Sequence, residues 1–206
     1  MSDLLSNFSL LGGRLALDFA NLPSLPASGS SNALSWEELI GFLQAARIVS
    51  PERAEELLAL TQSDPQSAFE LLKRAERLRN SLRLSFDSLA RRQRVLRSSV
   101  EPVNEILRVT EGHDELVESS RSWRIEYVAR ENSLDWLLAA VARSAAELIT
   151  EGESTRVRLC ANPACSLFFY DNSRTHRRRW CSMSLCGNRH KVAAFARRHA
   201  ARKRSA

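Results

Sequence analysis

Four cysteines lie close together near the end of this 206-residue sequence. They form two pairs, with four residues inside each pair and fifteen residues between the pairs. Structural zinc sites favour four cysteine thiolates arranged as a tetrahedron, and a turn signal such as Asn162-Pro163 lets a short pair point at one ion. The spacing therefore predicts one structural Zn²⁺ with the ligands Cys160, Cys165, Cys181 and Cys186.

Other roles for the cysteines fit the sequence less well. The N-terminus has neither the basic start nor the apolar core of a secretory signal, so we expect a cytoplasmic protein, in which structural disulfides are rare. Unliganded thiols would have to fall by chance within one 27-residue window. A catalytic zinc needs a position open to water, which four thiolates do not leave. His176 and His190 remain alternative ligands, although a nucleic-acid contact or a surface position suits each better.

The charge of the chain is divided unevenly. Residues 156–206 contain 13 Lys and Arg and one acid, Asp171, whereas residues 1–155 contain 17 basic and 23 acidic residues. The net charges are therefore +12 and −6. Such a division predicts two functional parts, with the basic part facing a polyanion, and the alternative is a solvated tail without a partner. The zinc site favours the first interpretation, so we expect residues 156–206 to form a basic, nucleic-acid-binding zinc module.

Basic residues on both sides of the second cysteine pair are the candidate contacts. Three precede Cys181 in a polar loop, and the others follow Cys186 in a helix that we expect to start at Gly187-Asn188. Cations on such a helix can contact phosphates or enter the major groove. The first turn of the helix suits either base readout or bracing of the zinc site. The candidates are Arg177, Arg178, Arg179, Arg189, Lys191, Arg197, Arg198 and Arg202.

The zinc module is too small and too charged to fold on a core of its own, so zinc should supply part of its folding free energy. Residues 156–159 and 167–170 are predicted to form a hairpin. Val192, Phe195 and His199 follow helical spacing and are expected to pack against the zinc core. The predicted small core consists of Val157, Leu159, Leu167, Phe168, Phe169, Trp180, Leu185, Val192 and Phe195.

Residues 1–152 are predicted to form a mainly helical domain. A capping box at 35–38 starts a helix that should reach about Arg47, and Ser50-Pro51 and Asp64-Pro65 start two more. The last of these helices should extend to about Arg97. Residues 109–129 have the alternation and turn signals of a hairpin, and helical spacing resumes at 134–148. The predicted fold class is therefore α+β, mainly α with a small antiparallel element, followed by a treble-clef-like or knuckle-type zinc module ending in a helix.

The chain begins with a glycine pair and an apolar stretch at residues 10–21, which predicts a strand or a buried extended segment. Asp18 lies inside this stretch, where an unpaired carboxylate would be unfavourable. We expect it to be paired with Arg14 or with backbone amides, and a ligand contact is the alternative.

Two segments resemble known families. Cys186-Gly187-Asn188-Arg189 is the tetrapeptide of the CGNR zinc fingers, and residues 158–165, 168–171 and 178–182 also resemble them. The segment GGRLALDFAN, residues 12–21, resembles the start of the ABATE domain, which precedes the CGNR finger in that family. The resemblance implies a zinc-dependent DNA-binding module, with the ligand role on the four cysteines, and a regulatory domain at residues 1–152 that senses stress or a small ligand.

The sequence thus predicts a transcription regulator that binds duplex DNA, with a small-molecule effector and a homodimer as further expectations. An RNA-binding zinc protein and a protein-docking adaptor folded by zinc are the alternatives, and competition between nucleic acids would separate them. An enzyme is not expected, because the sequence contains no P-loop, nucleophile elbow, dinucleotide fingerprint or HExxH motif. A membrane protein is not expected either, since the longest apolar run has seven residues and a span needs about 20.

Overall fold

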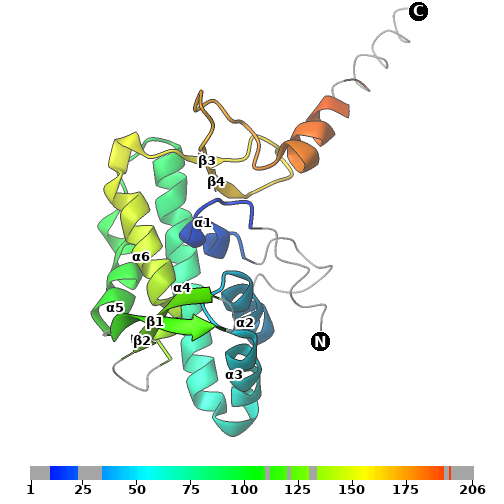
Figure 1. Ribbon diagram of the computed structural model, residues 1–206. Helices are drawn as coiled ribbons and strands as arrows, with labels where there is room; N and C mark the ends of the chain where they lie inside the picture. Colours follow the sequence, from blue (N-terminus) through cyan, green and yellow to red (C-terminus); the bar gives the residue numbers. More distant parts are fainter. Residues whose placement is uncertain are drawn as a thin grey trace, which may run out of the picture.

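The computed structural model describes residues 10–22, 34–109, 112–119, 122–129, 134–192 and 195. Within these ranges the chain is mostly helical, with two small antiparallel sheets. Helices α1 to α6 form the body of the molecule, and the zinc module lies at one end of it (Figure 1). This arrangement confirms the predicted fold class. No helix that is described is both long and apolar enough to cross a membrane.

The predicted starts of three helices are confirmed. Helix α2 (Trp36–Ala45) begins with a capping box in which Ser35 Oγ accepts from the Glu38 N–H (3.1 Å) and the Glu38 carboxylate accepts from the Ser35 N–H (2.8 Å). Helices α3 (Pro51–Ser63) and α4 (Pro65–Ala90) each begin at a proline. The preceding Ser50 and Asp64 cap them by accepting from a backbone N–H in the first turn.

Helix α4 ends at Ala90, so the predicted end near Arg97 is wrong. Arg92 adopts a left-handed conformation (φ 56°), and the N–H groups of Arg92 and Gln93 donate to Leu89 O (3.0 Å) and Ser88 O (2.8 Å). This pattern closes a helix. A 3₁₀ turn (η2, Arg97–Ser99) and a further helix (α5, Glu101–Val109) follow, neither of which was predicted.

The second half of the helical domain follows the prediction. Strands β1 (Gly112–Ser119) and β2 (Ser122–Ala129) form an antiparallel hairpin in which Leu116 is opposite Ile125. Helix α6 (Trp136–Thr150) then leads through a 3₁₀ turn (η3, Gly152–Ser154) into the zinc module.

Residues Leu15–Ala20 form a short helix, α1, and not the strand or extended segment that was predicted. Four of its six residues are buried. Helix α1 lies among α4, α6 and strand β4 (Phe168–Tyr170) of the zinc module. Because side chains on several sides of α1 are covered, its sequence is apolar without a helical period.

The zinc module begins with strands β3 (Val157–Leu159) and β4, which pair antiparallel as predicted, with Val157 opposite Tyr170. A π-helical turn, η4 (Met183–Gly187), contains Cys186, and α-helical residues continue from Asn188. The helix that was expected to start after Cys186 is therefore preceded by a wider turn that includes this cysteine.

Candidate metal centre and basic surface

The four cysteine sulfurs lie together, all within 4.8 Å of one another. Cys181 Sγ is 3.9 Å from Cys165 Sγ and 3.7 Å from Cys186 Sγ. Sulfurs bound at about 2.3 Å to a tetrahedral zinc are about 3.8 Å apart, whereas a disulfide needs about 2.05 Å. The four thiols are free and fit one zinc ion.

Backbone hydrogen bonds and one asparagine position the first cysteine pair. The Cys160 N–H donates to Leu167 O (3.0 Å), which closes the end of the β3–β4 hairpin. Asn162 Oδ1 accepts from the Ala164 N–H (3.2 Å), and Asn162 O accepts from the Cys165 N–H (2.8 Å). Asn162 Nδ2 also donates to Cys186 Sγ (3.3 Å), so this side chain connects the two cysteine pairs.

The second pair is held by the turn that contains it. The Ala161 N–H donates to Arg179 O (2.9 Å), which brings the segment before Cys181 against the first pair. Ser182 caps η4: its Oγ accepts from the Leu185 N–H (3.3 Å), and its carbonyl accepts from the Cys186 N–H (3.1 Å). The zinc geometry therefore depends on local turns, which is why the spacing alone could indicate it.

Burial determines how the metal-free thiols ionise. Burial raises the pKa of Cys165 to about 11 and also raises the pKa of Cys181. Burial opposes ionisation of Cys186 as well, but hydrogen bonds from Asn162 and the neighbouring thiols lower the pKa of Cys186. An incoming metal ion must displace protons from the raised thiols, so zinc affinity should increase with pH.

Strand β4 has side chains in two cores. Phe168 is buried in the core of the helical domain, where its ring is 6.2 Å from the ring of Phe86, and Val157 packs in the same core. Phe169 is buried among the cysteines instead. The hairpin is therefore shared between the helical domain and the zinc site, whereas the sequence predicted that all these side chains would form a separate small core.

The outer edge of β4 is bonded to the segment around α1. The Tyr170 N–H donates to Gly12 O (2.7 Å), and Asn21 forms two hydrogen bonds to the backbone of Phe168. Leu11 packs against the cysteine cluster. The segment that resembles the ABATE start thus holds the zinc module in place, a role that no local sequence signal indicated.

Asp18 is paired with a backbone amide, which was one of its two expected partners, and not with Arg14. Its Oδ1 accepts from the Gly12 N–H (2.7 Å), whereas Arg14 lies over the Tyr170 ring, 4.5 Å from the centroid. Burial raises the pKa of Asp18 to about 6, although hydrogen bonds from the backbone of Gly12 and Gly13 lower it. Oδ1 would also be 2.9 Å from a Cβ at Gly12, so the close approach requires glycine.

Asp171, the one acid of residues 156–206, is completely buried. Its carboxylate accepts from Ser173 Oγ (2.6 Å), from the Ser173 N–H (3.1 Å) and from the Arg178 N–H (2.9 Å). Burial opposes ionisation, but these hydrogen bonds and the charge of Arg158 lower the pKa of Asp171. The carboxylate therefore holds the arginine-rich loop of the zinc module (residues 171–179) from inside.

Arg178 points into the module. Its Nε donates to Trp180 O (2.9 Å), its terminal nitrogen donates to Cys181 O, and its guanidinium lies 4.9 Å from the Phe169 ring centroid. A guanidinium held in this way braces the segment that contains Cys181. Arg178 therefore has a structural role, and its contact with nucleic acid stays a prediction.

Other predicted contacts face solvent. Arg177, Arg179, Arg189 and Lys191 are exposed, and the guanidinium of Arg179 lies over the Trp180 ring at 5.1 Å. Arg197, Arg198, Arg202 and His199 lie outside the described residues.

The predicted apolar stripe of the last helix does not pack on the zinc core. Val192 is 68% exposed and Phe195 is 58% exposed, so this expectation is wrong. Leu159 and Leu185 of the predicted core are also exposed. The space beside the zinc site is occupied by Trp180, whose ring stacks on that of His190 (4.8 Å between centroids).

Neither histidine belongs to the metal-binding group found among the described residues. His176 is exposed in the arginine-rich loop, and its carbonyl accepts from Arg158 (2.9 Å). His190 is likewise exposed beside Trp180. The group consists of the four cysteines alone.

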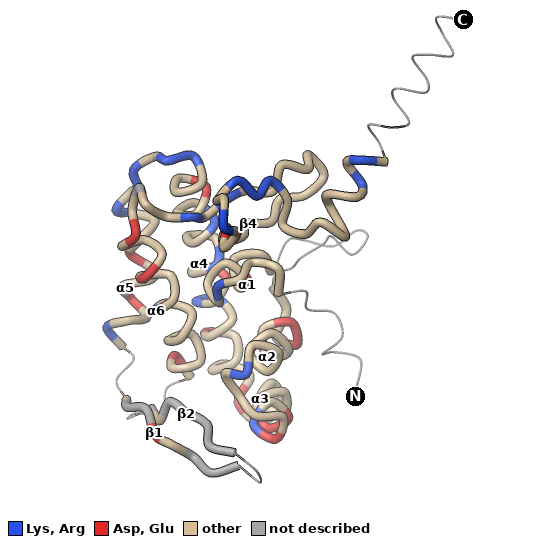
Figure 2. Tube along the Cα trace, turned by 45° about the horizontal axis from the view of Figure 1, so that its top comes forward, with Lys and Arg blue, Asp and Glu red and all other residues tan. Residues whose placement is uncertain are grey.

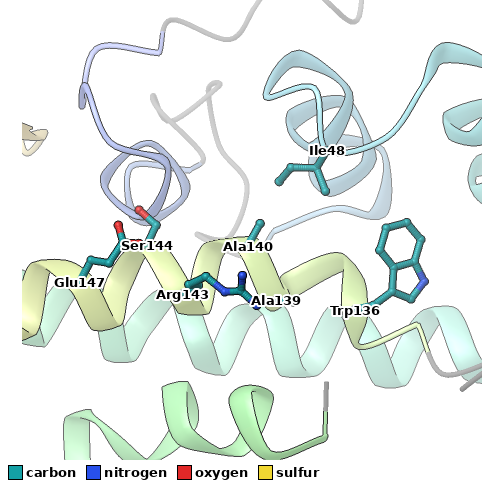
Figure 3. A pocket seen from close by; sticks show the side chains of 7 residues that line it. All are labelled: Ile48, Trp136, Ala139, Ala140, Arg143, Ser144 and Glu147. Atoms are coloured by element: carbon teal, nitrogen blue, oxygen red, sulfur yellow. The ribbon is translucent and has the colours of Figure 1, made fainter. Parts of the chain in front are cut away.

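An open pocket of about 200 Å³ lies along α6, on the helical domain (Figure 3). Most of its lining residues are apolar, and Arg143 and Glu147 supply one positive and one negative charge. Ser144 Oγ accepts from the Ala16 N–H of α1 (3.2 Å). The lining residues are Ile48, Trp136, Ala139, Ala140, Arg143, Ser144 and Glu147.

Two family models match different parts of the chain. A family model described as "CGNR zinc finger" matches residues 156–199. The ABATE family model, described as "Putative stress-induced transcription regulator", matches residues 13–152. No curated protein matches the chain. Because the second model covers more than half of the sequence, the chain belongs to the ABATE family of transcription regulators, and its four clustered cysteines are those of a CGNR zinc finger.

Proposed function

We propose that this regulator binds duplex DNA through its zinc module, with Cys160, Cys165, Cys181 and Cys186 as the zinc ligands. The observation that carries the proposal is the surface around the metal centre. Basic side chains face outward on both sides of the cysteine cluster, and the only acid of the module is buried beneath them. Such a surface attracts a polyanion.

Within this surface, the exposed residues Arg177, Arg179 and Lys191 are the proposed phosphate contacts. Arg189 is the proposed base-reading residue, because it lies in the first helical turn after η4, where a recognition helix enters a groove. Arg197, Arg198 and Arg202 continue the same basic sequence and belong to the proposal on that ground.

Duplex DNA is preferred to single-stranded nucleic acid because of how Trp180 is placed. Stacking on single strands requires aromatic rings whose faces are free. Trp180 is half-buried, with His190 and Arg179 against its ring. The proposed binding of DNA therefore relies on phosphate contacts and not on base stacking.

The proposed regulatory input is a small ligand in the pocket along α6. A cavity of about 200 Å³ is smaller than the roughly 300–1,000 Å³ that holds drug-sized ligands, so the ligand would be small. Ser144 connects the pocket to α1, and the flanks of α1 hold β4. A ligand in the pocket could thus affect the zinc module through two connections, from Ser144 to α1 and from the flanks of α1 to β4.

A second candidate function is protein docking by the last helix. The exposure of Val192 and Phe195, three residues apart on one helix, favours this alternative. It predicts that Phe195→Ser abolishes partner binding and leaves nucleic-acid binding unchanged.

The deciding experiment is competition binding of the full chain with duplex DNA, single-stranded DNA and structured RNA at one salt concentration. We expect duplex DNA to compete best. With about four to six phosphates contacted, log affinity should fall against log salt with a slope of about −4 to −5. Arg189→Ala should relax sequence preference while zinc content stays unchanged. Equal competition by all three nucleic acids, or tighter binding of RNA, would contradict the proposal.

A further inference from the structure

The loop after α4 is rich in arginine and lies outside the predicted nucleic-acid surface. Residues 91–97 contain four arginines, although residues 1–155 have a net charge of −6. All four side chains, Arg91, Arg92, Arg94 and Arg97, are exposed. Asp87 in the last turn of α4 pairs with Arg91 (2.8 Å) and offsets only one of them. The loop is therefore a positive patch on an acidic domain.

This loop lies at the end of α4 that contacts the zinc module. In the last turns of α4, the Phe86 ring packs against Phe168 of β4, and the Arg83 guanidinium donates to Ser166 O (3.4 Å). Helix α4 ends at Ala90, one turn after Phe86. Figure 2 shows lysines and arginines gathered along this end of the molecule, both in the loop after α4 and in the zinc module. One extended polyanion can therefore lie against both.

Hydrogen bonds and packing give the loop a defined shape. Arg92 and Gln93 close the end of α4, and the left-handed position of Arg92 is one that glycine adopts with less strain. Further along, Ser85 Oγ donates to Ser99 O (3.1 Å), and Val95 packs against the core of the helical domain. A backbone fixed in this way loses less conformational entropy when a partner binds, which lowers the cost of binding.

We propose that Arg94 and Arg97 contact the phosphate backbone of the DNA duplex that the zinc module binds, so that the helical domain forms part of the interface. The inference rests on the proposed function. Within the described part of the chain, neither side chain forms an ion pair. Both are thus available to phosphates. Because the loop and the zinc module lie at the same end of the molecule (Figure 2), the proposed occupant of the loop is the same duplex DNA.

The test compares two double variants that remove equal charge. Arg94→Gln/Arg97→Gln changes the loop, and Arg47→Gln/Lys73→Gln removes two positive charges from other exposed positions of the helical domain. Lys73 lies on α4, the helix that precedes the loop. It is 18 residues before Arg91, which corresponds to about 27 Å along the helix axis. Because the net charge is identical, any difference between the variants reports position. Circular dichroism melts establish that both are folded.

Binding of the full chain to one duplex is measured by fluorescence anisotropy over a range of salt concentrations. We expect the loop variant to reduce the magnitude of the salt slope by about 1.8, at about 0.9 per phosphate contact, and to weaken binding roughly tenfold or more at about 0.1 M salt. The control should retain the wild-type slope. Equal slopes in the two variants would overturn this inference and leave the proposed function standing. A wild-type chain that binds no duplex DNA would overturn both.

Discussion

The side-chain amide of Asn21 satisfies both backbone groups of Phe168, 147 residues away in the sequence. Nδ2 donates to Phe168 O (2.8 Å) and Oδ1 accepts from the Phe168 N–H (2.9 Å), and both bonds are buried. These backbone groups point away from β3, so one asparagine replaces a neighbouring strand at the outer edge of β4.

Replacing this asparagine should weaken the attachment of the zinc module. Asn21→Ala leaves two buried backbone groups of Phe168 without partners, which should lower the free energy of unfolding by about 2–4 kcal/mol. Chemical denaturation followed by circular dichroism measures the loss. The exposed Asn172 lies close by in the sequence, and Asn172→Ala serves as the control. Equal stability of the two variants would mean that the hairpin is held by its other contacts and does not need the Asn21 side chain.

Removing zinc should affect both parts of the chain. We expect a chelator, or Cys186→Ser, to unfold the segment after β4 first, because the metal supplies part of the folding free energy of this module. Since Val157 and Phe168 belong to the core of the helical domain, the melting temperature of that domain should also fall by several degrees. Zinc release and helix content are followed in the same titration. A helical transition that does not move on zinc loss would show that the hairpin stays docked without the metal.

Arg178 should support the metal centre, whereas its neighbour Arg177 should support DNA binding. Arg178→Ala removes hydrogen bonds to the carbonyls of Trp180 and Cys181, so it should reduce zinc retention and thermal stability. Arg177→Ala removes an exposed side chain and should leave both unchanged, while lowering the salt slope of DNA binding by about 0.9. Zinc content, melting temperature and salt-dependent binding are compared for the two variants. If Arg178→Ala kept its zinc and lost only affinity, its side chain would have to leave the metal centre on binding DNA.

Asp18 should make stability fall as pH rises towards neutrality. Its folded pKa of about 6 lies above its ordinary value of 3.8, so its contribution to stability is complete below about pH 4 and is lost as pH rises through about 6. Asp18→Asn keeps an acceptor for Gly12 but has no charge. Between pH 4 and 7 the variant should therefore lack a decrease of about 1–2 kcal/mol that the wild type shows.

Denaturation at a series of pH values measures this difference. Glu55→Gln, at an exposed position of α3, is the control and should follow the wild type. Parallel curves for Asp18→Asn and the wild type would show that Asp18 is solvated well enough to ionise normally.

Features determined by neighbouring residues could be predicted from the sequence. The cysteine spacing indicated a cluster that the structure contains, and Ser35, Ser50 and Asp64 marked helix starts correctly, because caps and turns act over a few residues. The end of α4 was missed because arginine favours helices, so the helical pattern continues past the point where Arg92 closes the helix.

Features determined by distant contacts could not be predicted. The conformation of Leu15–Ala20 depends on α4, α6 and β4, which cover several of its sides. Spacing placed Val192 and Phe195 on one face of a helix, but it gives no information on whether another element covers that face. The pairing of Asn21 with Phe168 likewise joins two segments that carry no matching signal.

Because the Phe168–Tyr170 strand is completed by residues from the beginning of the chain, this finger is not a freely interchangeable cassette. A chimera joined at Thr155 would combine the β4 strand of one parent with the segment around Gly12 and Asn21 of another. The position of β4 would then depend on hydrogen bonds between segments that come from different proteins. Finger exchange between family members should therefore transplant residues 11–22 together with residues 156–206. A binding specificity moved without that first segment would be carried on a finger whose orientation is no longer set.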